Sequence, residues 1–141
     1  MPDTEVWVGL VIKGDFDFDP DDITRRLGLE PARKWSKGEV RSQLTGRVAP
    51  TSGWAIDSES SIEADTIEPH LAWLLDLLEP HAEALSAIVA TGAFAYADCC
   101  WRSPGFGGGP WIAPESMRRL AALDLPLIIS FYLYRPDESG D

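Results

Sequence analysis

The 141-residue chain has few of the residues on which catalytic and metal chemistry most often depends. Its only two cysteines, Cys99 and Cys100, are adjacent, so on a strand they would point to opposite faces with no partner for a disulfide. Reduced thiols of this kind are typical of a cytoplasmic protein. Its only two histidines, His70 and His81, would lie about 16 Å apart along one helix, too far to share a metal. We therefore expect no catalytic constellation, no metal site and no cofactor.

Long hydrophobic runs are missing as well. No apolar stretch approaches the roughly 20 residues that a transmembrane helix needs. The first residues, Met-Pro-Asp-Thr-Glu, lack the basic and apolar regions of a signal peptide and lead directly into a strand-like run. These features predict a cytoplasmic protein with no membrane partner.

Positive charge is scarce and unevenly placed. The chain carries 23 acidic and 12 basic residues, a net charge of −11, and has no Lys or Arg from Val48 to Trp101. Seven of the basic residues gather within residues 25–47, beside two acids. Nucleic-acid binding needs a broad basic face that neutralises phosphates, so we expect no nucleic-acid partner. The charge pattern permits a basic protein partner, or a small anion at the local basic segment.

Hydrophobic periodicity and turn residues predict an α+β protein. Strands are expected at residues 5–13, 53–58, 93–101 and 125–134, and helices at 20–27, 65–90 and 114–123. Short extended stretches are expected around 34–35 and 46–48. Asp65 and Glu68 have the spacing of a capping box, and Pro80 should kink or break the long helix near Glu79.

A strand, a loop and a proline-led helix with an arginine pair occur at 5–31 and again at 93–126, where PDDITRRLGLEP parallels PESMRRLAALDLP. Two such βαβ-like halves, joined by the long kinked helix, would build a mostly antiparallel sheet of four to five strands. Helices would pack on one face in a two-layer arrangement. We expect one α+β domain over residues 1–134 and a frayed acidic tail at 135–141.

Two segments have the composition of ligand-binding loops without their pattern. Residues 15–19 alternate aspartates as an EF-hand does, but Pro20 and Arg26 replace the required Gly and Glu. This segment is therefore interpreted as an acidic turn that caps a helix. Residues 105–110, GFGGGP, lack the Lys-Ser/Thr of a Walker loop and are interpreted as a mobile connector.

The basic segment also contains tryptophan, of which the chain has six. Charge and stacking nominate six candidate residues for an anionic ligand: Arg33, Lys34, Trp35, Lys37, Trp54 and Trp111. Trp111 and the glycine loop would form a lid. The alternative is structural, with Trp35 packed under the loop and Arg33 or Lys37 paired with an acid or a helix end.

Four short pieces carry a family resemblance: LGLEP at 27–31, Trp35 with Lys37-Gly38, Gly53-Trp54, and HLAWLL at 70–75. Through them the chain resembles the bacterial domain of unknown function 4279 family over about residues 5–134. The resemblance implies the element order given above and no activity. Family members resemble the small acidic proteins of bacterial toxin–immunity sets.

These observations favour a non-catalytic protein-binding domain, in the form of an immunity-type inhibitor of a basic bacterial toxin. Four acids of the predicted long helix would steer that partner: Glu68, Asp76, Glu79 and Glu83. The alternative function is a small-molecule or anion-binding domain, or an enzyme, that uses the basic-aromatic segment 33–54.

Overall fold

The structure is a computed structural model that describes residues 4–103 and 109–133. Its elements are β1 (Glu5–Gly14), α1 (Pro20–Leu27), β2 (Arg33–Trp35), β3 (Ser52–Asp57), α2 (Ile67–Leu78), the 3₁₀ turn η1 (Glu79–His81), α3 (Ala82–Ala90), β4 (Phe94–Ser103), α4 (Pro114–Ala122) and β5 (Leu127–Leu133). The tail expected at 135–141 and most of the glycine loop lie outside the described residues. No helix in the described ranges is both long and apolar enough to cross a membrane.

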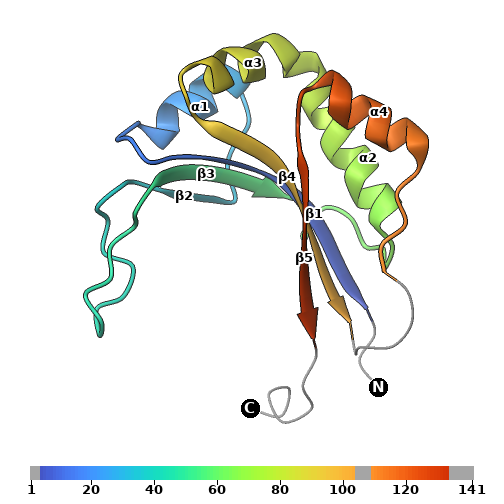
Figure 1. Ribbon diagram of the computed structural model, residues 1–141, viewed down its shortest axis with the longest axis horizontal. Helices are drawn as coiled ribbons and strands as arrows, with labels where there is room; N and C mark the ends of the chain where they lie inside the picture. The colour runs from blue at the N-terminus through green and yellow to red at the C-terminus, as the bar shows by residue number, and fades with distance from the viewer. Residues whose placement is uncertain (1–3, 104–108, 134–141) are drawn as a thin grey trace.

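The five strands form one mixed sheet in the order β2-β3-β1-β4-β5. The β4–β5 pair is parallel and the other three pairs are antiparallel. The helices lie on one face of this sheet (Figure 1). The predicted two-layer α+β fold is therefore confirmed. Of the two expected halves, β4–α4–β5 is a true βαβ unit, whereas β3 lies between β1 and β2 in the other.

The core follows from the alternation of side chains along β1. Val8, Leu10 and Ile12 are 0 % exposed and point toward the helices, where they join the buried leucines of α2 in one apolar cluster. Complete burial of a side chain of this size contributes about 1.5–3 kcal/mol. The intervening residues of β1 face away from the helices, and they form part of the candidate site described below.

The long helix is interrupted at the predicted place. α2 ends at Leu78, and η1 connects it directly to α3. Pro80 has no N–H to donate, and its ring would clash with the carbonyl group four residues earlier in a continuous α-helix. A tighter 3₁₀ turn therefore replaces one α-helical turn here. The predicted capping box is wrong, because the N-cap residue of α2 is Thr66 instead of Asp65 and its side chain makes no capping hydrogen bond.

The acidic turn before α1 has the predicted capping role. The Asp19 carboxylate accepts a hydrogen bond from the N–H of Asp21 at 3.0 Å, and Gly28 ends the helix with a φ of 67° that suits glycine. Between β2 and β3, residues 36–51 form an arm in which Val40 and Val48 make an antiparallel bridge. Figure 1 shows the arm extending away from the helices.

A buried histidine ties the end of β3 to β1 and α2. His70 is 1 % exposed, and its Nε2 lies 2.8 Å from the carbonyl oxygen of Ala64. A carbonyl only accepts, so Nε2 carries the proton and Nδ1 accepts from the Ser58 hydroxyl at 2.6 Å. The Ser58 oxygen also accepts from the N–H of Val8 at 3.0 Å. His70 is thus fully used in the fold.

Replacing Ser58→Ala should lower the free energy of unfolding by about 1–3 kcal/mol, because the Val8 N–H and His70 Nδ1 would remain buried without partners. Urea denaturation measures this. Ser61→Ala removes an exposed hydroxyl nearby and should change stability by less than about 0.5 kcal/mol. Equal stability of the two variants would contradict the proposed role of the network.

Candidate binding groove on the open face of the sheet

The sheet face opposite the helices, called the open face below, carries a hollow of about 960 Å³. No described helix covers this face (Figure 1). We call the hollow the groove, and its largest polar and aromatic lining residues are Trp7, Lys13, Arg33, Trp35, Arg41, Asp57, Glu59, Tyr96, Asp98 and Tyr132. A volume near the upper end of the usual ligand-pocket range suits a small molecule.

Small residues form the floor of the groove. Across the sheet, Gly9 lies between Asp57 and Asp98, and Val11 lies between Ala55 and Tyr96. A Cβ on Gly9 would overlap the carbonyl oxygen of Ile56, so the chains approach closely here only because residue 9 has no side chain. Larger side chains around this low centre leave the hollow open.

Trp35 lies over a second glycine at the edge of the groove. A Cβ on Gly53 would overlap the indole ring, and Trp35 Nε1 donates to Thr51 Oγ1 at 3.2 Å. The guanidinium carbons of Arg33 and Arg41 lie 5.8 and 5.5 Å from the ring centroid, within cation–π distance. The indole is therefore held between the sheet and two cations.

Among the described residues that line the groove, cations and carboxylates are equal in number. Its cations are Lys13, Arg33 and Arg41, and its carboxylates are Asp57, Glu59 and Asp98. Within residues 4–103 and 109–133, none of these six takes part in an ion pair. On the helix side of the protein, cations such as Arg26, Lys34 and Arg119 do have carboxylate partners. The groove thus presents charge that the described chain leaves available.

The thiol of Cys100, which lines the groove, and that of its neighbour Cys99 are poor nucleophiles. Burial, followed by the nearby Asp98 carboxylate, raises the pKa of both Cys99 and Cys100 to about 12. Cys100 donates weakly to Asp98 at 3.7 Å, while Cys99 points into the core. Both thiols stay protonated near neutral pH, so they supply hydrogen-bonding and packing atoms to their surroundings.

The six ligand residues nominated from sequence are divided between the two faces. Arg33 and Trp35 line the groove, whereas Lys34 points to the helix side and binds Asp21 at 2.7 Å. Strand alternation causes this separation, since neighbours along β2 face opposite ways. Lys37 donates through Nζ to the carbonyl oxygen of Asp15.

The two remaining tryptophans of that set lie away from the groove. Trp54 is 0 % exposed beneath α1, where its Nε1 donates to Thr24 Oγ1 at 3.0 Å, so a surface ligand does not reach it. Trp111 is 70 % exposed before α4 and is not a lining residue. Most of the glycine loop in the predicted lid, residues 104–108, lies outside the described part of the chain.

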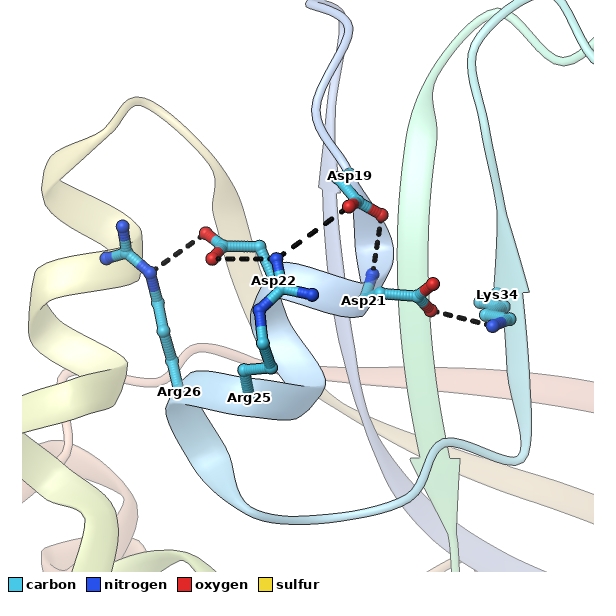
Figure 2. Close-up of polar contacts among 6 residues, drawn as sticks. All are labelled: Asp19, Asp21, Asp22, Arg25, Arg26 and Lys34. Carbon is cyan, nitrogen blue, oxygen red and sulfur yellow. Dashed lines mark hydrogen bonds and ion pairs between the residues drawn. The ribbon is translucent and has the colours of Figure 1, made fainter.

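Acids at the start of α1 pair with three of the seven cations of the basic segment. Figure 2 shows the carboxylates of Asp19, Asp21 and Asp22 beside Arg25, Arg26 and Lys34. Arg26 Nε lies 2.9 Å from Asp22, and Lys34 lowers the pKa of Asp21 through a hydrogen bond and its charge. These cations are occupied by their own chain. Of the basic segment, Arg33 and Arg41 are the two that face the groove.

Several groove residues were missed by sequence analysis: Trp7, Lys13, Arg41, Asp57, Tyr96, Asp98 and Tyr132. The signal available was the alternation of β1, which assigns Trp7 and Lys13 to one face opposite the apolar residues. The neighbours on β4 could be placed beside them only after the strand order was known, since that order depends on contacts between distant segments.

The acidic side chains proposed for a basic partner are largely engaged by α4. Arg119 Nη2 lies 2.6 Å from Asp76 and 2.8 Å from Glu79. Glu68 accepts a hydrogen bond from the Ser116 hydroxyl at 3.1 Å, while Glu83 is exposed on α3. The hydrogen bond from Arg119 lowers the pKa of Glu79. This face is therefore less negative than its sequence indicates.

The fold and the groove define a small two-layer α+β protein with one sheet face left open, charged and aromatic. The chain belongs to the domain of unknown function 4279 (DUF4279) family, whose family model matches residues 4–134. This confirms the resemblance identified from sequence. No curated protein and no solved structure matched the chain.

If Gly53 is required as the seat of Trp35, its effect on stability must depend on that ring. Gly53→Ala should destabilise the protein by about 1–3 kcal/mol, because the new methyl group displaces the indole. In a Trp35→Ala background the same change should cost close to nothing. A double-mutant cycle by urea denaturation measures the coupling, and additive effects would show that Gly53 serves another purpose.

The ion pairs of Arg119 give a pH-dependent prediction. A carboxylate with a lowered folded pKa stabilises the protein above its unfolded pKa, and this contribution is lost as the pH falls through the folded value. Arg119→Ala should therefore be less stable than the parent by up to about 1 kcal/mol at pH 7, with a difference that shrinks below about pH 4. Arg118→Ala, which removes a more exposed pair with Glu115, serves as control. A difference independent of pH would contradict this account.

Proposed function

We propose that this protein is a small-molecule-binding domain whose groove holds an anionic ligand. The observation that carries the proposal is the placement of Arg33 and Arg41 against Trp35 at the rim of a hollow, without ion-pair partners in the described residues. Arginine presents a rigid planar set of donors that matches carboxylate and phosphate groups. The geometry thus supports anion recognition at this rim.

Stacking on Trp35 also prepares the two arginines for binding. A guanidinium that lies against an indole ring samples fewer rotamers than one in free solvent, so less conformational entropy is lost when a ligand arrives. Trp35 is itself fixed by the sheet below it and by Thr51. Trp7 and Tyr96 add aromatic surface to the lining of the groove, and Lys13 lies over the Tyr96 ring with its Nζ 5.4 Å from the ring centroid.

The inhibitor function considered from sequence draws less support from the geometry. Two of its four steering residues, Asp76 and Glu79, already share the cation of Arg119, so part of the proposed acidic face is neutralised within the chain. A basic protein partner would have to compete for these groups. We therefore favour the small-molecule function.

Isothermal titration calorimetry with 4-methylbenzoate and with inorganic phosphate tests the proposal. Both probes carry the negative charge that the arginines would bind, and 4-methylbenzoate adds a planar ring. We expect saturable binding of at least one probe. The double variant Arg33→Ala/Arg41→Ala should bind it at least about tenfold more weakly, since each lost charge-assisted hydrogen bond costs about 1.5–3 kcal/mol.

The matched control is Arg47→Ala/Arg118→Ala. It removes the same charge from the arm and from α4, at two exposed positions outside the groove lining. Its affinity should equal that of the parent protein. Retained binding in the Arg33/Arg41 variant, equal losses in both double variants, or no saturable binding of either probe would overturn the proposal.

A further inference from the structure

The charges of the groove are segregated along the strands. Lys13 and Trp35 flank Gly53 in one row across the sheet, and Arg33 lies in the next row beside Ala55. Arg41 joins this end through its contact with Trp35. Lys13 and Arg33 are therefore attached to the sheet toward the end of the groove formed by the last residues of β1 and the first residues of β3, and Arg41 contacts Trp35 at that end.

The carboxylates occupy the following rows. Asp57 and Asp98 lie on either side of Gly9, and Glu59 follows shortly after the end of β3. Rows two residues apart on a strand are separated by about 7 Å. The distance between the row of Arg33 and the row of the two aspartates is thus about the length of a small organic molecule.

Neutral donors hold the carboxylates in place without cancelling their charge. Asp98 accepts from the Ser130 hydroxyl at 3.2 Å and from the Cys100 thiol, and Asp57 accepts from the backbone N–H of Glu59 at 3.1 Å. None of these donors is cationic. Their arrangement orients both aspartates while the negative charge stays available to a ligand.

We infer that the groove selects a small zwitterion, with its anionic group at Arg33 and Arg41 and its ammonium group at Asp57 and Asp98. This inference rests on the proposed function and adds the second charge that the ligand carries. A simple anion would satisfy the arginines but would bring its negative charge toward two carboxylates. A ligand with both charges complements both ends, and a planar spacer would lie on the small-residue floor between Tyr96 and Trp35.

A series of three para-substituted benzoates separates the two claims: 4-methylbenzoate, 4-(aminomethyl)benzoate and terephthalate. They share a ring and a carboxylate, and the group at the opposite end is a neutral methyl, a cationic aminomethyl or a second carboxylate. Calorimetry should show that 4-(aminomethyl)benzoate binds about tenfold more tightly than 4-methylbenzoate, from charge-assisted hydrogen bonds to the aspartates. Terephthalate should bind more weakly than either.

The variant Asp57→Asn/Asp98→Asn keeps the shape of both side chains and removes their charge. It should lose the preference for 4-(aminomethyl)benzoate while still binding 4-methylbenzoate at least as well as the parent. The control Glu63→Gln/Glu83→Gln removes two exposed carboxylates outside the groove lining and should keep the preference. Thermal unfolding and near-ultraviolet circular dichroism establish that each variant is folded.

The outcomes distinguish this inference from the proposed function. If 4-methylbenzoate binds but the ammonium adds nothing, or if terephthalate binds most tightly, the groove is an anion site and the zwitterion inference is overturned. If the preference survives in the Asp57/Asp98 variant, the ammonium lies elsewhere and the inference is likewise overturned. If none of the three benzoates binds, the zwitterion inference is overturned, and the proposed function falls with it when inorganic phosphate also fails to bind.

Discussion

The strict alternation of side chains along a strand is the constraint on which the rest of this structure depends. Each strand sends one set of residues to the helices and the next set to the open face. In β3 this places Trp54 in the core and leaves Gly53 as the seat of Trp35. A one-residue slip in β3 would exchange these roles, expose a large indole and fill the groove. Core and groove are therefore set by the same register.

Charge in this protein is organised by short-range pairing more than by its total. The chain has a net charge of −11, yet acids at the start of α1 pair with Arg25, Arg26 and Lys34 (Figure 2). Arg119 does the same between α4 and α2. What stands out is a groove with balanced but separated charges. The net charge affects how a distant charged partner approaches the protein, whereas a bound ligand interacts with the local charged groups of the groove.

Local signals explain why most of the fold could be predicted. Asp19 and Gly28 delimit α1, Pro80 marks the break after α2, and the β-branched runs identify the strands, because each depends on neighbouring residues alone. The insertion of β3 between β1 and β2 had no such signal, since strand order is decided by contacts between distant segments. Of the ten large lining residues of the groove, composition nominated two, Arg33 and Trp35, and it nominated none of those on β1 and β4.

The small size of β2 has a consequence for how this protein would respond to its ligand. Only three residues of this edge strand pair with β3, and Trp35 is one of them. Segments with so few backbone bonds open locally at a small fraction of the global unfolding free energy. A ligand bound by Arg33 and Arg41 would therefore stabilise β2 and the arm against local opening, because its binding energy is added where the native structure is weakest. Ligand binding in the groove and local ordering of the arm would then be thermodynamically coupled.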